Sequence, residues 1–161
     1  MAATSHLYLL MIFHCSRFLY ASHDFRFISR RDLETSVTSF FHHGTVSYSE
    51  MLFDISRNEV LVSAKDAIFR LTLNELYLLE KTTWSASKEN VSQCVTKGQS
   101  EDLCQNYIQI LQKKGNKLLA CGTHAFQPQC TWRKMENLSH VTEWVNGIAK
   151  CPYSHCRIIQ V

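Results

Sequence analysis

Apolar residues recur at every second position from residue 46 onward, which is the period of a β-strand. The pattern predicts two strands joined by a polar turn at residues 56–59. Each strand has one apolar face, formed by Met51, Phe53 and Ile55 in the first strand and by Val60, Val62 and Ala64 in the second. Regular structure is therefore expected to begin with a β-hairpin.

Two further short strands follow after a turn at Lys65-Asp66. Residues 68–73 place Phe69, Leu71 and Leu73 on one side, and residues 76–79 are apolar on both faces. Four short strands with tight connections form one blade of a β-propeller, where stacking buries strands on both faces. A helix over residues 67–80 is the competing interpretation. The neighbouring alternation and the Phe and Thr content favour strands.

A second hairpin is predicted from residues 107–112 and 117–121, with the turn Lys113-Lys114-Gly115-Asn116 between them. It would begin a second blade. The polar residues 85–93 before it are expected to form a loop, and residues 100–104 a single helical turn.

The first residues of the chain have a different composition. Residues 7–20 are mostly apolar and are followed by the small pair Ala21-Ser22, so residues 1–21 form a candidate secretory signal. Arg17 interrupts the run, and a buried N-terminal strand is the alternative. The run is too short for a membrane span, and no other stretch approaches eighteen apolar residues. Residues 22–44 are expected to be a lead-in loop, although residues 32–41 could form a short helix.

Composition indicates a globular protein, since 45% of the 161 residues are hydrophobic. The net charge is only +3, and the 17 Lys and Arg residues are scattered along the chain. This argues against nucleic acid or an anionic membrane as a partner. We interpret the pairs Arg30-Arg31 and Lys113-Lys114 as solvated loop charges.

Five of the seven cysteines lie between residues 94 and 151, as two closely spaced pairs and one follower. The spacing of about ten residues, filled by Gly, Asn, Ser and Pro, suits small covalently closed loops in an oxidising compartment. Each such loop contributes roughly 2.5 to 3 kcal/mol in the loop-closure model. Two acceptor sequences for N-glycosylation, at Asn90 and Asn137, also suit a secreted chain.

Three ordered motifs in this region closely resemble the N-terminal part of the semaphorin domain. They are Cys104-Gln-Asn-Tyr-Ile, the ten residues Cys121-Gly-Thr-His-Ala-Phe-Gln-Pro-Gln-Cys130, and Ala149-Lys-Cys-Pro-Tyr-Ser154. Ile68-Phe-Arg-Leu71 also looks like the first blade of that family. The motifs are most similar to the transmembrane semaphorins with thrombospondin-type repeats (class 5). The resemblance covers roughly residues 40–154, the opening part of a domain that is several times longer in the family.

The resemblance implies an all-β fold, a partial seven-bladed β-propeller (sema domain) with the first blade and part of the second in residues 45–154. Residues 155–161 form a divergent tail, and we expect a truncated form of the domain. The resemblance also implies disulfides joining Cys94 to Cys104 and Cys121 to Cys130. It leaves Cys151 and Cys156 without assigned partners.

Semaphorins are ligands of plexin receptors that steer axons and migrating cells. The resemblance therefore implies a secreted or extracellular signalling ligand, with full-length relatives also at the plasma membrane. Receptor-contacting surfaces of the family lie on later blades. We therefore expect this chain alone to be marginally stable, to bind no plexin and to form no family homodimer.

We expect no catalytic activity and no cofactor. Gly98-Gln-Ser-Glu-Asp102 lacks the final glycine of a nucleophile elbow, and the sequence has no His-Glu-x-x-His motif and no Gly-rich phosphate loop. His42-His43 beside Gly44 is interpreted as an exposed turn, not a metal site.

One alternative remains open. Cys121 and His124 could form a thiol site, or could bind zinc together with Cys130 and one more ligand. That would describe an intracellular zinc-stabilised or thiol-dependent protein and would require a reducing compartment.

Overall fold

The computed structural model describes residues 28–146. It divides into two units, one ending at Val37 and the other beginning at Thr38. The first unit contains the helix α2 (Arg30–Ser36), which begins after Ser29 because the Ser29 hydroxyl accepts a hydrogen bond from the Asp32 N–H. The expectation of a loop is therefore wrong for residues 30–36. The signal sequence predicted at residues 1–21 lies outside the described residues.

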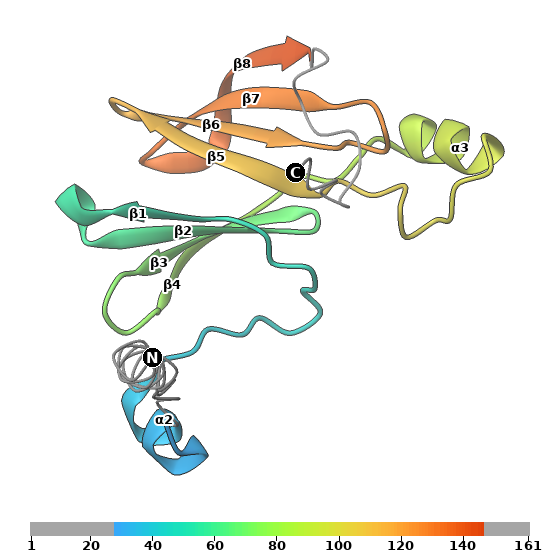
Figure 1. Cartoon of the computed structure of the whole chain (residues 1–161). Coiled ribbons are helices and arrows are strands. Elements are labelled where there is room, and N and C mark those ends of the chain that lie inside the picture. Colours follow the sequence, from blue (N-terminus) through green and yellow to red (C-terminus); the bar gives the residue numbers. More distant parts are fainter. Residues whose placement is uncertain (1–27, 147–161) are drawn as a thin grey trace, which may run out of the picture. The chain divides into compact units, whose positions relative to one another are not determined.

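The second unit opens with an antiparallel sheet of four strands in the order β1-β2-β3-β4 (Figure 1). The strands are β1 (Met51–Asp54), β2 (Glu59–Ala64), β3 (Ala67–Thr72) and β4 (Leu78–Thr83). This confirms strands rather than a helix over residues 67–80. Ile55 was placed in the first strand, but it begins the short 3-10 helix η2 (Ile55–Arg57) instead. The fourth strand begins two residues later than predicted and extends to Thr83.

A second antiparallel sheet follows in the order β5-β6-β7-β8. Its strands are β5 (Ile108–Lys114), β6 (Lys117–Gly122), β7 (Gln129–Lys134) and β8 (Asn137–Asn146). The predicted hairpin is confirmed, with a shorter turn at Gly115-Asn116, where Gly115 has φ 58°. The sheet has four strands, so the second blade extends further than the part that the sequence analysis expected.

The core lies between the two sheets. Side chains of β2 alternate, so Leu61 faces the second sheet while its neighbours Val60 and Val62 pack with Phe69 and Leu71 on the opposite face. The cluster between the sheets consists of Leu61, Ile68, Trp84, Ile108, Leu118, Ala120, Met135 and Leu138. Burying each large apolar side chain contributes about 1.5 to 3 kcal/mol. Stacking therefore fixes the sheets face to face.

The connection between the sheets contains the helix α3 (Lys88–Thr96), where the sequence analysis expected a loop. That expectation is wrong. The Ser87 hydroxyl accepts a hydrogen bond from the Asn90 N–H, and Glu89 lies in the first turn, where it complements the helix dipole. The predicted helical turn at residues 100–104 is confirmed by a hydrogen bond of 3.2 Å from the Cys104 N–H to the Ser100 carbonyl. In residues 28–146, no helix has the length and apolar character needed to span a membrane.

Candidate functional site at the junction of the sheets

Asn106 lies just before β5, is fully buried, and bonds to three segments. Its backbone exchanges two hydrogen bonds with Asp66 in the β2–β3 turn: the Asn106 N–H donates to Asp66 Oδ1 (3.1 Å) and its carbonyl accepts from the Asp66 N–H (2.8 Å). Its Nδ2 donates to the Trp84 carbonyl (2.7 Å) and its Oδ1 accepts from the His124 N–H (3.0 Å). Each of these buried polar groups is paired, so Asn106 ties the first sheet to the second.

Asp66 shares this junction and adopts φ 61°. Burial raises the pKa of its carboxyl group, against the lowering effects of the hydrogen bond from Asn106 and the charge of Lys65. The Asp66 carbonyl accepts the Trp84 N–H at 2.9 Å, so the turn also fixes the chain that leaves β4.

Two disulfides flank the junction. Cys94 of α3 is joined to Cys104, with 5.8 Å between their Cα atoms. Cys121 of β6 is joined to Cys130 of β7, and these two residues are directly paired in the ladder. Both pairs are buried, and the first packs against Ala125. The first disulfide holds α3 onto the segment that leads into β5.

The loop between β6 and β7 contains three consecutive residues with left-handed backbone: His124 (φ 44°), Ala125 (φ 58°) and Phe126 (φ 62°). Each costs of order 1 kcal/mol or more in a non-glycine residue, so the surroundings must hold the turn. The Ala125 N–H donates to the Gln105 carbonyl at 3.0 Å, and the His124 N–H is held by Asn106.

His124 also links the turn to α3. Its ring is almost completely buried, with 7% of the residue exposed, and Nδ1 lies 3.0 Å from Asn90 Nδ2. Burial lowers the pKa of His124. The ring centroid lies 6.3 Å from that of Trp84, and the guanidinium of Arg133 stacks on the same indole at 4.9 Å. Burial lowers the pKa of Arg133 to about 10, although the charge of Glu80 opposes this.

Charged contacts join the sheets away from the junction. Lys113 Nζ of β5 lies 2.6 Å from Oδ2 of the buried Asp54 and donates to Ser56 Oγ at 3.2 Å. Burial alone would raise the pKa of Asp54, but the bonds from Lys113 and Ser56 and the charge of Lys113 lower it below its usual value. The interpretation of Lys113 as a solvated loop charge is therefore wrong, because it lies on a strand that faces Asp54.

Glu80 of β4 makes a comparable bridge. Its Oε1 accepts the Leu138 N–H at 2.9 Å, and its Oε2 lies 3.0 Å from Arg70 Nη2. Arg70 in turn donates to the Met135 carbonyl at 3.1 Å. Polar contacts thus join the edge strands β4 and β8 of the two sheets, and the Asp54–Lys113 pair joins the opposite edge strands β1 and β5.

Known proteins with similar sequences are semaphorins. No family model matches the chain. Semaphorin 5c of Drosophila melanogaster is 47% identical over 131 residues, which is 81% of this chain and 12% of that protein. Human Semaphorin-5B is 40% identical over 126 residues, covering 78% of this chain and 11% of the relative. The chain belongs to the semaphorin family. It spans only about an eighth of the length of these relatives.

Solved semaphorin structures show the same arrangement of strands. The extracellular domains 1-2 of Drosophila Semaphorin 1a match with a TM-score of 0.64 and 29% identity, covering 73% of this chain and 23% of that one. Drosophila Plexin A in complex with Semaphorin 1b matches with a TM-score of 0.57 and 30% identity, covering 66% and 21%. The two sheets of this semaphorin chain are therefore adjacent blades of a sema β-propeller, as predicted from the sequence, and the sema domain is extracellular.

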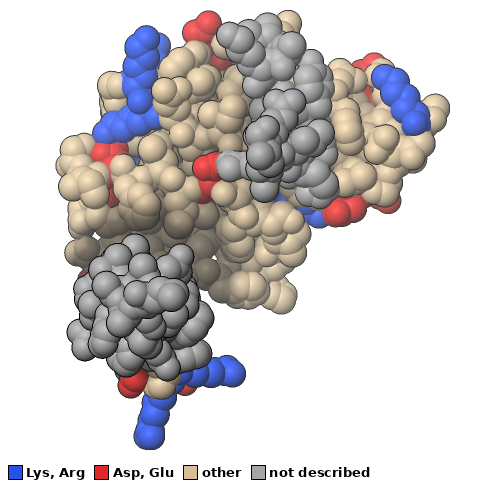
Figure 2. Space-filling model, in the orientation of Figure 1, with Lys and Arg blue, Asp and Glu red and all other residues tan. Residues whose placement is uncertain are grey.

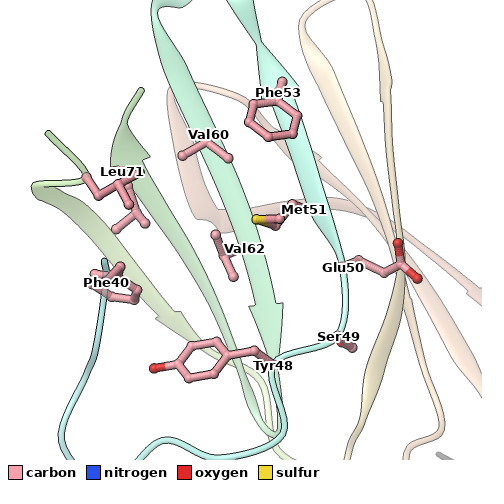
Figure 3. A pocket seen from close by; sticks show the side chains of 10 residues that line it. Phe40, Tyr48, Ser49, Glu50, Met51, Phe53, Val60, Val62 and Leu71 are labelled. Atoms are coloured by element: carbon pink, nitrogen blue, oxygen red, sulfur yellow. The ribbon is translucent and has the colours of Figure 1, made fainter. Parts of the chain in front are cut away.

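The outer face of the first blade is hollowed by an apolar groove of about 460 Å³ (Figure 3). The residues that line it include Phe40, Tyr48, Met51, Phe53, Val60, Val62 and Leu71. Met51 and Phe53 form the face that the alternation predicted, yet they are 64% and 57% exposed. Within the described residues, only the β1 part of this face is uncovered, because Phe40 and Tyr48 pack on Phe69 and the rest of the cluster is buried.

The two candidate glycosylation sites differ in their surroundings. Asn137 is exposed at the start of β8, where its Oδ1 accepts the Ser139 N–H at 3.1 Å. Asn90 lies within α3 and is half-buried because its amide meets His124. Its acceptor sequence thus lies in a helix and not in the expected loop. Cys151, Cys156 and the motif at residues 149–154 lie outside the described residues.

The residues of the alternative zinc site, Cys121, His124 and Cys130, are not arranged to bind a metal ion. The sulfur atoms of Cys121 and Cys130 are bonded to each other, so neither presents a thiolate to a metal. His42 lies at a turn, with Nδ1 3.1 Å from Thr45 Oγ1 and its ring 5.2 Å from that of Phe69. Across residues 28–146, no group of three His, Cys, Asp or Glu residues could hold a metal ion.

On the face in Figure 2, Lys and Arg are dispersed rather than gathered into one patch.

Proposed function

We propose that this chain provides two blades of an extracellular semaphorin ligand that binds a plexin-type receptor and acts in axon guidance and cell migration. The observation that supports this most directly is the similarity of both blades to Semaphorin 1b, whose solved complex contains Plexin A. The proposed activity is binding and not catalysis, and it needs no cofactor.

We assign the receptor binding to a whole sema domain and not to these two blades alone. A propeller blade is stabilised by burying both of its faces against neighbours. Here the groove over Met51 and Phe53 is uncovered in the described part of the chain. The isolated chain is therefore expected to bind plexin weakly or not at all, and to form no family homodimer.

A chimera tests the proposal in a complete domain. Residues 38–146 would replace the aligned segment of human Semaphorin-5B, and the secreted protein would be titrated onto plexin-expressing cells beside unmodified Semaphorin-5B. We expect saturable binding of similar affinity, since the inter-blade contacts lie within the exchanged segment. A monodisperse chimera that is secreted at normal levels but does not bind would refute the proposal.

The isolated 161-residue chain is the matched second arm of this experiment. Cells expressing plexin and parental cells without it would receive the same purified, monodisperse material. Equal, non-saturable signal on both cell lines is expected. Saturable binding in the nanomolar range would show that these two blades contain receptor contacts of their own.

A further inference from the structure

We propose that His124 makes the attachment of α3 to the second blade sensitive to acid, so that α3 opens locally when the pH falls from about 7.5 to about 5.5. This regulatory contact is independent of receptor binding. It concerns the junction of α3 with the left-handed turn between β6 and β7.

The imidazole of His124 lies between α3 and Trp84. It is 7% exposed, its Nδ1 lies 3.0 Å from Asn90 Nδ2 on α3, and its ring lies against Trp84. A neutral imidazole can accept the amide proton of Asn90 at Nδ1. A protonated imidazole has no acceptor, so protonation sets two donors against each other unless the Asn90 amide rotates.

Burial disfavours a positive charge on the imidazole more than the hydrogen bond to the backbone of His124 itself favours one, so the pKa of His124 is lowered. From α3 comes the neutral amide of Asn90, while the exposed Glu89 on that helix meets Gln93 at 3.5 Å. From the segment after β4 comes the indole of Trp84, and from the segment before β5 the amide of Asn106. The neighbouring charge on β7 is the guanidinium of Arg133, which stacks on Trp84 and has the same sign as a protonated histidine.

Two features make the opening local. The disulfide between Cys94 and Cys104 keeps the end of α3 attached to the segment before β5. The left-handed turn at residues 124–126 is held by Asn106 and Gln105 independently of α3, so it can keep its conformation when α3 opens. The sheets themselves are joined elsewhere, through the Asp54–Lys113 pair and the apolar core.

Acid should weaken the contact between His124 and α3, because the ring is buried. Because burial lowers the pKa of His124 below its ordinary value of 6.5, the contact is fully stable above about pH 6.5 and loses stability as the pH falls. In the open form the ring is solvated and takes up its proton near the ordinary value. The opening constant should therefore rise by up to about tenfold between about pH 7.5 and about pH 5.5.

Hydrogen exchange on the full secreted chain measures this opening. Amide exchange in α3 would be followed at both pH values and corrected for the intrinsic exchange rate at each. The wild-type opening constant should rise by up to about tenfold, while that of His124→Asn should stay constant, since asparagine tolerates positive φ and does not titrate. The control is His140→Asn on the exposed face of β8, which should respond as the wild type does.

A wild-type opening constant that is independent of pH would overturn the proposal, as would an equal acid response in His124→Asn. Should that variant fail to fold, NMR titration of the His124 C2–H in the wild-type chain provides a second measurement. An apparent pKa below 6.5 supports the proposal, and a value at or above 6.5 contradicts it.

Discussion

Gly122 lies so close to Asn106 that a Cβ added to the glycine would be 2.1 Å from the Asn106 amide oxygen. That oxygen accepts the His124 N–H, and the amide nitrogen on the same group donates to the Trp84 carbonyl. The side chain of Asn106 therefore cannot retreat without breaking both bonds. Glycine at position 122 is required by this close approach and not by its backbone conformation.

Gly122→Ala should destabilise the chain by about 2 to 3 kcal/mol, because the added methyl group displaces a fully paired buried amide. Urea denaturation followed by tryptophan fluorescence measures this. The matched control is Gly115→Asn, at a turn where nothing lies within 4 Å of an added Cβ and where asparagine tolerates φ 58°. It should change stability by less than about 0.5 kcal/mol. Equal effects of the two substitutions would contradict the role assigned to Asn106.

Lys113→Met should cost about 2 kcal/mol near neutral pH, because it leaves the buried Asp54 carboxylate without its cation. The pKa of Asp54 is lowered in the folded chain, so the pair's contribution is present above the ordinary value of 3.8 and is lost as the pH falls below it. Unfolding curves at about pH 7 and about pH 3 should therefore differ less for the variant than for the wild type. Lys114→Met, at the exposed neighbouring lysine, is the control, and a similar loss there would argue against the pair.

Alternation of apolar residues was sufficient to predict β1, β2 and β3, because a half-buried strand repeats every two residues. The β5–β6 hairpin was predicted from the turn residues between its strands. The later strands of the second blade follow no such pattern. Thr131 and Arg133 of β7 are buried polar residues, satisfied by each other and by Trp84 and Leu138, so they interrupt the apolar alternation. Trp84 is distant from β7 in the sequence, so the local sequence does not reveal the stacking that buries Arg133.

The helix α3 and the junction were missed for related reasons. Residues 88–96 are mostly polar, and only the cap at Ser87 and the acidic Glu89 indicated a helix start. The motif at residues 121–130 was recognised as a family feature, but nothing in it shows that Gly122 and His124 both meet Asn106. Such relationships depend on the stacking of two blades and not on local sequence.

Peptide mapping under non-reducing conditions should recover Cys94 linked to Cys104 and Cys121 linked to Cys130. We expect these two links because the cysteines of each pair lie close together in the folded chain. The first pair joins α3 to the turn that follows it, and the second joins directly paired strand residues. Free thiols on these four residues in secreted material, or a Cys104–Cys121 link, would contradict the pairing.

The two glycosylation acceptors should differ in occupancy on secreted protein. Asn137 is exposed at the start of a strand, whereas the Asn90 amide nitrogen lies 3.0 Å from His124 Nδ1 in a half-buried helix position. We expect Asn137 to be largely modified and Asn90 to be modified on a smaller fraction of chains. Intact mass before and after glycosidase treatment measures this, with Ser139→Ala and Ser92→Ala assigning each glycan. Higher occupancy at Asn90 would show that transfer precedes formation of α3.

The exposed β1 side chains of the first blade should govern how the isolated chain behaves in solution. Met51 and Phe53 are more than half exposed beside the apolar groove, and burying them against a second surface would contribute about 1.5 to 3 kcal/mol each. Met51→Gln with Phe53→Gln should therefore raise the monomeric fraction of secreted chain severalfold, as measured by size-exclusion chromatography with light scattering. Tyr77→Gln is the control, because this residue is 68% exposed but does not line the groove. If Tyr77→Gln raises the monomeric fraction by the same factor, the removal of any exposed apolar side chain, and not the groove, controls association.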